Sequence, residues 1–225
     1  MTEPLVSYVL PTKNRVEWLG EALLSLVTQS EPDIEIIVIN DGSTDDTKEL
    51  LESAWVQADH RIRVIHHEES QGAGPSRNEG TVLAKANIVA QFDDDDMSVD
   101  NRTYETLKWF KEHPESEMVS FPYVRVSMLN EIQENFPGEP FDYEEYAKNG
   151  HIRYFCNPSC AYKRESFLDT KGYQRESKDE TDDYGMVRNW IKAGKKIDFC
   201  PGEAVLLHRV LPNSMMTQFR GYDGK

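Results

Sequence analysis

The chain has no apolar stretch long enough to cross a bilayer, and its N-terminus lacks the pattern of a signal peptide. It contains only three cysteines, Cys156, Cys160 and Cys200, and no CxxC pair. A zinc ribbon and a disulfide framework are therefore not expected, and reduced thiols in the cytoplasm are the simplest interpretation. Peripheral association with the inner face of a membrane, the oligomeric state and a longer parent chain stay open.

Basic residues are also scarce. Lysine and arginine together number 25 against 40 aspartate and glutamate residues, so the net charge is −15 at pH 7. Such a charge repels nucleic-acid backbones and anionic membrane surfaces, and a nucleic-acid partner is therefore not expected. An anionic substrate would need a metal ion or a local basic pocket to bind. The length of 225 residues is sufficient for one large domain with a sizeable core.

Apolar runs alternate with amphipathic segments through the first hundred residues. Four short apolar runs are predicted as buried strands: residues 5–10, 34–39, 61–66 and 88–92. Helices are predicted between them, and in the first one Leu19, Leu23 and Leu26 recur at three- and four-residue spacing. Pro11 is expected to end the first strand, because proline cannot donate to a ladder. The alternation predicts an α/β fold with a mostly parallel central sheet and flanking helices.

The other predicted elements follow from caps, breakers and weaker periodicity. Helices are expected at about 44–58, 74–86, 100–113, 143–148 and 182–193, strands at 118–126 and 204–207, and a loop over most of 130–150. The sequence contains no internal repeat.

Four consecutive aspartates, Asp93 to Asp96, come directly after the predicted strand 88–92. Four like charges at the end of a core strand repel one another, so folding alone gives little reason for them. A divalent cation would give a reason, because Mg²⁺ and Mn²⁺ prefer oxygen ligands. A solvated acidic turn is the alternative. Two further polar clusters, at 11–15 and 41–43, also lie at strand ends, where open parallel sheets bind their ligands, so we expect one shared pocket.

Four short motifs occur in order: Pro11-Thr12-Lys13-Asn14-Arg15, then Asn-Asp-Gly-Ser-Thr-Asp at 40–45, Gly-Pro-Ser-Arg-Asn-Glu-Gly at 74–80 and Phe-Asp-Asp-Asp-Asp at 92–96. Each motif alone is weakly specific, but their order and spacing resemble those of family 2 glycosyltransferases, which have the GT-A fold. The resemblance covers the first hundred residues and resumes near Asp182. It implies a single GT-A-like domain, residues 1–225, with a nucleotide-sugar-binding half at 1–97 and an acceptor-binding half at 98–225 that contains a smaller acceptor-side subregion.

The resemblance implies a binding site for the nucleotide of a nucleotide-sugar donor, expected to be a UDP-sugar. The residues that match this site are Pro11, Thr12, Asn14, Arg15, Asp41, Ser43, Arg77, Asp93 and Asp94. A carboxylate such as Asp41 can accept from the uracil N–H, and the guanidinium of Arg77 suits phosphate. The alternatives are a turn-forming role for Asp41 and a surface ion pair for Arg77.

The acidic run resembles the Asp-x-Asp motif of the family, which implies a bound Mn²⁺ or Mg²⁺. Asp95 is the expected direct metal ligand, and Asp93 and His208 are further candidates. Asp93 and Asp94 are alternatively expected to contact the ribose or to reach the metal through water. For His208, which follows the apolar run 204–207, a structural role is the equal alternative.

Asp182-Asp183-Tyr184 resembles the Glu-Asp motif of the family, with aspartate in place of the usual glutamate. The second acid of that motif is the catalytic base, so the resemblance implies this role for Asp183 and a supporting or acceptor-binding role for Asp182. An acid that caps a helix is the alternative for Asp183. Trp190 is a further acceptor-side candidate because its ring can stack on a sugar, with core packing as its alternative.

The resemblance implies an inverting, metal-dependent glycosyltransferase that moves a sugar from a nucleotide-sugar to an acceptor hydroxyl, in cell-surface glycan or polysaccharide synthesis. Asp183 would take the hydroxyl proton, and the metal would stabilise the leaving diphosphate. Two alternatives stay open: a non-catalytic domain that binds a nucleotide-sugar or a glycan, and a metal-dependent nucleotidyltransferase. The second would normally carry a glycine-rich loop after the first strand, and residues 11–15 contain no glycine.

Overall fold

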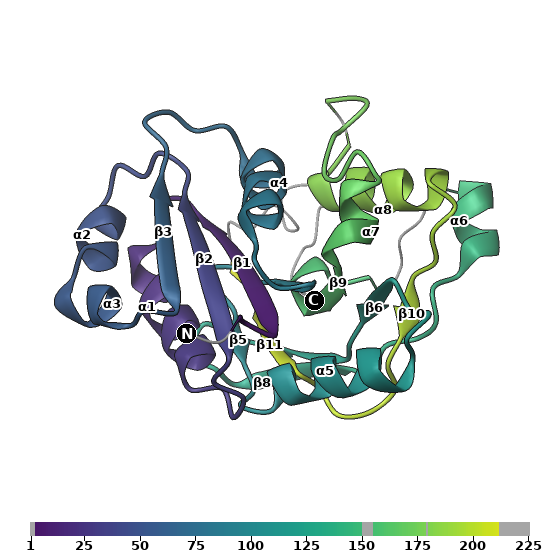
Figure 1. Cartoon of the computed structure of the whole chain (residues 1–225), viewed down its shortest axis with the longest axis horizontal. Helices are drawn as coiled ribbons and strands as arrows, with labels where there is room; N and C mark the ends of the chain where they lie inside the picture. Colours follow the sequence, from purple (N-terminus) through teal and green to yellow (C-terminus); the bar gives the residue numbers. More distant parts are fainter. Residues whose placement is uncertain (1–2, 150–154, 179, 212–225) are drawn as a thin grey trace.

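A seven-stranded sheet forms the centre of the molecule (Figure 1). The computed structural model describes residues 3–149, 155–178 and 180–211. The strands of this sheet are β1 (Val6–Thr12), β2 (Ile34–Asn40), β3 (Ile62–His66), β4 (Ile88–Gln91), β6 (Met118–Ser120), β9 (Cys160–Lys163) and β10 (Asp198–Phe199). Their order across the sheet is β10-β6-β9-β4-β1-β2-β3.

The four strands predicted in the first half of the chain are confirmed, and they lie next to one another. β1 pairs in parallel with both β2 and β4, and β2 pairs in parallel with β3. β9 comes from the second half of the chain and runs antiparallel to its neighbours β4 and β6. The sheet is therefore parallel over the strands whose carboxyl ends carry the predicted polar clusters.

β1 continues through Pro11 to Thr12, beyond its predicted end. The Val9 carbonyl accepts a hydrogen bond from the backbone N–H of Phe92, so the odd-numbered residues of β1 turn their backbone groups towards β4. The pairing of β4 with β1 ends at Val9. The backbone nitrogen of Pro11 therefore faces the β4 side beyond the last β1–β4 pair. No ladder hydrogen bond is required there, so a residue without an N–H fits.

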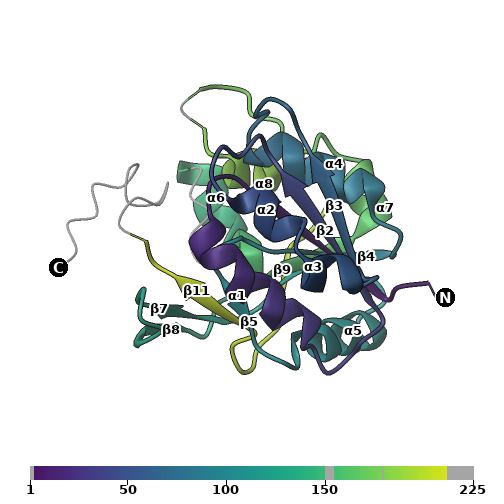
Figure 2. The same ribbon diagram turned by 90° about the vertical axis from the view of Figure 1, so that its left-hand side faces the viewer.

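A smaller sheet contains β5 (Met97–Ser98), β7 (Tyr123–Val126), β8 (Ile132–Phe136) and β11 (Leu206–Arg209), in the order β5-β11-β7-β8 (Figure 2). The predicted single strand at 118–126 is wrong, because Pro122 separates β6 in the large sheet from β7 in the small one. The predicted loop at 130–150 is also corrected, since residues 132–136 form β8, an edge strand with mostly exposed side chains. The pairing of β11 with β5 brings the chain near residue 208 next to the acidic run.

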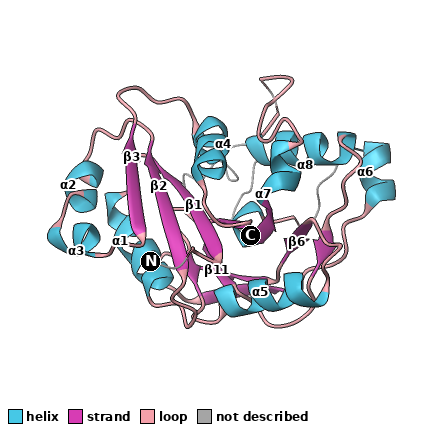
Figure 3. Cartoon of the chain, in the orientation of Figure 1, coloured by secondary structure: helices cyan, strands magenta, loops and turns pink. Residues whose placement is uncertain are grey.

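Helices cover both faces of the large sheet (Figure 3). They are α1 (Val16–Val27), α2 (Thr47–Leu51), α3 (Ala54–Ala58), α4 (Ala73–Leu83), α5 (Arg102–Glu112), α6 (Tyr143–Asn149), α7 (Arg164–Leu168), α8 (Asp182–Lys192) and the 3₁₀ helix η1 (Asn157–Ser159). The helix predicted at 44–58 is two short helices, α2 and α3, and α7 was not predicted. Within the described part of the chain, no helix combines the length and the apolar composition that crossing a membrane requires.

Alternate residues of β1 point into two separate apolar cores. Tyr8 and Leu10 pack in the core that α1 and α5 cover, together with Leu23. Val9 packs in the core on the other face, which contains Trp190 of α8. Because both faces are buried, the strand has the nearly continuous apolar sequence of a central parallel strand. The two cores fix α4 and α8 on one face of the sheet, and both helices begin near the carboxyl ends of its strands.

We predict that Gly80→Ala destabilises the fold by about 1–3 kcal/mol, because α4 packs against β1 at this glycine. A Cβ atom at position 80 would lie 2.4 Å from Cγ1 of the fully buried Val9. The control is Gly20→Ala in α1, where a Cβ atom meets nothing within 4 Å and alanine should stabilise the helix by up to about 1 kcal/mol. Urea unfolding of both variants measures the difference. Equal stability of the two would contradict this packing.

Candidate active site

Three aspartates of the acidic run gather their carboxylates after the end of β4. One carboxylate oxygen from each of Asp93, Asp95 and Asp96 lies within 4.8 Å of the others, which is a grouping that could hold a metal ion. Asp96 is fully buried, whereas Asp93 and Asp95 are half-buried. The predicted ligands Asp95 and Asp93 are therefore brought together, and Asp96 joins them.

The strand β11 supplies the partners of Asp96. The backbone N–H of Arg209 donates to Oδ1 of Asp96 at 2.9 Å, and Nδ1 of His208 lies 3.1 Å from both of its carboxylate oxygens. His208 was predicted as a metal ligand, but this nitrogen faces Asp96, and Asp96 takes its place in the group of three carboxylates. Burial disfavours protonation of His208, but the charge of Asp96 outweighs it and raises the pKa of His208 to about 9.

Negative charge accumulates here beyond what the neighbouring cations balance. Burial, together with the charges of Asp96, Asp94 and Asp93, raises the pKa of Asp95 to about 8. A divalent cation would remove this repulsion, because the available ligands are the hard oxygen atoms that Mg²⁺ and Mn²⁺ prefer. Because Asp96 is buried and Asp93 to Asp95 are half-buried, the acidic run is not a fully solvated turn.

Arg77, in α4, lies beside this carboxylate group. Its Nη2 donates to Oδ1 of Asp93 at 2.6 Å, and its guanidinium carbon lies 5.6 Å from the ring centroid of Tyr173. The side chain is only 7% exposed, so the ion pair is not the surface pair considered as an alternative. Arg77 thus presents a buried positive charge directly beside the carboxylate group.

The loop after β1 is tied to the loop after β2. Asn14 has the left-handed backbone conformation (φ 54°), and its Oδ1 accepts from the backbone N–H of Thr44 at 2.7 Å. The N–H of Asn14 in turn donates to Oγ of Ser43 at 3.0 Å. These contacts place the predicted nucleotide-binding residues of the two loops side by side.

Asp94 lies between this pair of loops and the carboxylate group. Burial raises the pKa of Asp94 to about 7, although Thr12 and the charge of Arg15 oppose the shift. Pro11 and Thr12 themselves are buried in β1. The side chain of Asp94 therefore belongs to the side of the site where the loop 12–15 lies.

Asp41 organises the loop between β3 and α4. Its carboxylate accepts hydrogen bonds from Oγ of Ser70 at 2.6 Å and from the backbone N–H groups of Gln71 and Gly72 at 2.8 and 2.9 Å. Nδ1 of His67 lies 2.8 Å from its Oδ1. Burial disfavours the charge, but these bonds outweigh it and hold the pKa of Asp41 well below its usual range. Asp41 is therefore an ionised, nearly inaccessible residue at the base end of the predicted site.

The first turn of α8 brings Asp183 to the same site. Thr181 caps the helix, since its Oγ1 accepts from the backbone N–H of Tyr184. Burial raises the pKa of Asp183 to about 6, the charge of Arg77 opposes the shift, and the charges of Asp93 and Asp182 add to it. Asp183 thus lies within electrostatic reach of both Arg77 and Asp93, although it is about ninety residues away from Asp93 in the sequence.

Asp182 connects two helices at the site. Its Oδ2 accepts from the backbone N–H of Gly74 at 3.1 Å, and its Oδ1 lies 3.1 Å from Nε of Arg175. The side chain, which is 11% exposed, connects the beginning of α8 to the beginning of α4. These contacts fit the supporting role, and its assignment to the acceptor side stays a prediction.

The assignment of Trp190 to the acceptor side is wrong. The side chain is fully buried in the core between α8 and the sheet, and its Nε1 donates to the carbonyl of Lys196 at 2.9 Å. No face of the ring is open to an acceptor sugar. Core packing, the alternative, is the role that the structure gives to this residue.

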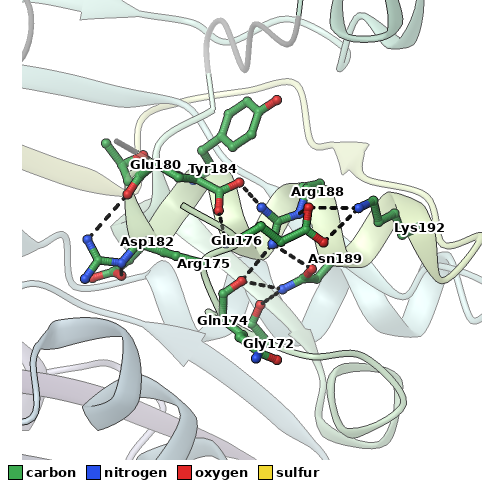
Figure 4. Close-up of polar contacts among 11 residues, drawn as sticks. Gly172, Gln174, Arg175, Glu176, Glu180, Asp182, Tyr184, Arg188, Asn189 and Lys192 are labelled. Atoms are coloured by element: carbon green, nitrogen blue, oxygen red, sulfur yellow. Dashed lines mark hydrogen bonds and ion pairs between the residues drawn. The ribbon is translucent and has the colours of Figure 1, made fainter. Parts of the chain in front are cut away.

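A polar network before and along α8 holds the segment that precedes Asp183 (Figure 4). Arg188 forms a buried ion pair with Glu180 and donates to the carbonyl of Gln174 at 2.8 Å. Asn189 donates to the carbonyls of Gly172 and Gln174 at 2.8 and 2.9 Å. The sequence did not predict these roles, because the carbonyls that accept the bonds carry no side-chain signal.

A hollow of about 560 Å³ lies elsewhere, before the amino ends of β2 and β3, where Trp55 and Arg61 line it. Among the described residues, its lining includes none of those predicted for the site.

Comparison with known proteins gives a family match. The model of glycosyl transferase family 2 matches residues 7–170, which includes the acidic run but ends before α8. The glycosyltransferase GlyG of Streptococcus pneumoniae serotype 4 is 33% identical over 147 residues, which cover 64% of this chain and 47% of GlyG. TuaG of Bacillus subtilis (strain 168), provisionally named a teichuronic acid biosynthesis glycosyltransferase, is 33% identical over 110 residues. These cover 49% of this chain and 43% of TuaG. The chain thus spans less than half the length of these relatives.

Two solved structures share the fold. S. aureus TarS in complex with UDP-GlcNAc matches with a TM-score of 0.71 and 20% identity, over 94% of this chain and 60% of that one. The mannosyltransferase PcManGT of Pyrobaculum calidifontis, in complex with GDP-Man and Mn²⁺, matches with a TM-score of 0.71 and 18% identity. The match covers 96% of this chain and 60% of PcManGT. The expected GT-A-like α/β fold is confirmed.

We predict that Arg188→Gln destabilises the protein by about 3–5 kcal/mol, because it leaves Glu180 as an unpaired buried charge. The matched control is Lys192→Gln on the same helix, which removes an exposed ion pair with Glu176 and should change stability too little to resolve. Chemical unfolding of the two variants checks this. If both variants unfold at the same denaturant concentration as the parent, the network does not hold α8.

Proposed function

The chain belongs to glycosyl transferase family 2. From this premise we propose that it transfers a sugar from a nucleotide-diphosphate donor to an acceptor hydroxyl, and that the nucleotide is UDP. The observation that carries the proposal is that Asp183 and Arg77 meet at Asp93, a member of the group of three carboxylates. This arrangement combines a base, a phosphate-binding cation and a metal site. The complexes of TarS with UDP-GlcNAc and with UDP support UDP as the nucleotide.

The residues present fit a divalent metal ion. Three carboxylate oxygens that lie within 4.8 Å of one another offer the hard, negatively charged ligands that Mn²⁺ and Mg²⁺ prefer. Asp93, Asp95 and Asp96 would hold Mn²⁺ or Mg²⁺. When bound there, the ion supplies a Lewis acid that stabilises charge developing on the leaving diphosphate.

The donor would be held by residues of the half 1–97. Arg77 would bind the diphosphate, because its guanidinium is buried and faces the carboxylate group. The loops at 12–15 and 41–43 would enclose the nucleoside, with Asp94 on the ribose side. Their mutual hydrogen bonds hold this arrangement before the donor arrives, which lowers the entropy cost of binding.

Asp183 would act as the general base. A carboxylate with a pKa of about 6 is ionised at neutral pH, and it is a better proton acceptor than an ordinary aspartate. It would take the proton of the acceptor hydroxyl while that oxygen attacks the anomeric carbon and the bond to the diphosphate breaks. A single displacement of this kind inverts the anomeric centre. The half 98–225, which carries α8, would bind the acceptor, and the name of TuaG supports a cell-surface polysaccharide as the product.

One assay separates this proposal from the two alternatives. Release of UDP from UDP-sugars, measured with and without Mn²⁺ and with candidate acceptors, supports the transferase. Pyrophosphate release from a nucleoside triphosphate supports a nucleotidyltransferase instead. UDP-sugar binding without turnover under any of these conditions supports the non-catalytic binding domain.

We predict that Asp183→Asn lowers turnover by about 10²–10⁴-fold and leaves the affinity for UDP nearly unchanged, because the amide cannot accept the proton. In the parent enzyme, turnover should fall as the pH drops through about 6, since Asp183 then becomes protonated. The control is Asp169→Asn, whose side chain is 74% exposed. A pH profile of UDP release measures both effects. Turnover of Asp183→Asn at the parent rate would remove Asp183 from the mechanism.

We predict that a chelator abolishes UDP release and that Mn²⁺ restores it. Asp95→Asn should weaken metal binding by about 10-fold or more, because it removes one charged oxygen ligand from the group. Asp100→Asn, in an exposed position just after the acidic run, is the control. UDP release that continues unchanged in excess chelator would exclude the metal from the reaction.

A further inference from the structure

The imidazole ring of His67 lies between two carboxylates. Its Nδ1 is 2.8 Å from Oδ1 of Asp41, and its Nε2 is 2.6 Å from Oε2 of Glu79. The His67 side chain is 7% exposed, and those of Asp41 and Glu79 are 4% and 38% exposed. This residue follows β3, and neither the family motifs nor the mechanism above uses it.

The geometry determines the protonation state of the ring. An ionised carboxylate only accepts hydrogen bonds, so a ring nitrogen that faces one must carry a proton. Both nitrogens of His67 face carboxylates, and a ring with both nitrogens protonated is a cation. Burial disfavours this charge, but the two carboxylates outweigh it and raise the pKa of His67 above its ordinary value. Glu68 and Glu69, on the same loop, are exposed.

The cation joins two parts of the proposed donor site. Asp41 lies at the base end and also binds the backbone N–H groups of Gln71 and Gly72. Glu79 lies in α4, two residues after Arg77, which pairs with Asp93. His67 therefore connects the loop that would surround the base with the helix that would hold the diphosphate.

We propose that His67 is a positioning residue of the donor site, which as an imidazolium holds the loop 67–72 against α4 in the geometry that binds the nucleotide. This rests on the proposed function, because it assumes that the base and the diphosphate bind at the two parts that His67 connects. His67 touches neither substrate nor metal and acts through Asp41 and Glu79.

Loss of the proton breaks one of the two contacts. A neutral imidazole has a single N–H, so its other nitrogen would present a lone pair to a carboxylate. The contact with Glu79 is the one that opens, because Glu79 is more exposed and can turn to water, whereas Asp41 is held by three other donors. The connection is therefore present at low pH and is lost as the pH rises through the raised pKa of His67.

The chain offers a matched set of variants. Glu79→Gln keeps the connection without a charged ring, because the amide N–H of glutamine can donate to the unprotonated Nε2. His67→Gln removes the bridge at every pH, since one amide group cannot donate to both carboxylates in this geometry. His66→Gln is the control: His66 is exposed, and its Nδ1 contacts the side-chain amide nitrogen of Asn40 at 3.0 Å, so this nitrogen accepts the bond and the ring needs no charge.

The experiment measures UDP affinity with Mn²⁺ for the four proteins between about pH 6 and pH 9, where an imidazolium with a raised pKa loses its proton. The UDP affinity of each protein is divided by that of Glu79→Gln at the same pH. This ratio cancels the pH dependence that comes from the titration of UDP and of the metal ligands. We expect the parent and His66→Gln to weaken by about threefold to tenfold relative to Glu79→Gln as the pH rises, in line with one lost charged hydrogen bond. His67→Gln should be weaker throughout and show no such change.

A second measurement does not depend on UDP. An ordinary histidine has a pKa of about 6.5 and is mostly neutral above that pH. In the free parent protein, nitrogen NMR should show that both ring nitrogens of His67 are still protonated above about pH 6.5. Titration of His67 at or below that value overturns the inference. So does the same pH dependence of UDP affinity in all four proteins. If no variant binds UDP at any pH, the proposed function fails and the role in donor binding fails with it, even where NMR detects the charged ring.

Discussion

The rest of this structure depends on one electrostatic constraint, the concentration of negative charge at the carboxyl ends of β4 and its neighbours. Asp93, Asp95 and Asp96 bring their carboxylates together, and Asp183 arrives from α8. Arg77 and His208 balance part of this charge, but burial and the charges of the neighbouring aspartates still raise the pKa of Asp95. Surplus buried negative charge is costly for folding, which is why we assign its neutralisation to a bound cation.

Helix α4 connects the parts that surround this charge. Its first turn binds Asp182 through the N–H of Gly74, its middle carries Arg77, and Glu79 faces His67. Gly80 lets the helix approach β1 closely, so the packing of α4 on the sheet fixes the position of these contacts. A displacement of α4 would therefore move Arg77, Glu79 and the contact with Asp182 together. This explains how the proposed donor site could be organised before any ligand binds.

The sequence predicted the elements whose signals are local. The parallel strands and the acidic run after β4 were recognisable because an apolar run leads directly into charge. The role of Asp96 was not, because it depends on β11, more than a hundred residues later, pairing with β5. Trp190 has the same composition signal whether it stacks on a sugar or fills a core, and only packing separates the two. His67 was missed because its partners come from two other elements.

Thermal unfolding of the parent protein and of Asp95→Asn, each with and without saturating Mn²⁺, tests the central claim most directly. The account predicts that Asp95→Asn without metal is more stable than the parent, because folding no longer has to bury a carboxyl whose pKa burial and the neighbouring aspartates raise. It also predicts that Mn²⁺ stabilises the parent more than the variant, since the variant binds the ion more weakly. A parent protein whose stability is unaffected by Mn²⁺, together with a variant that is less stable without metal, would contradict it.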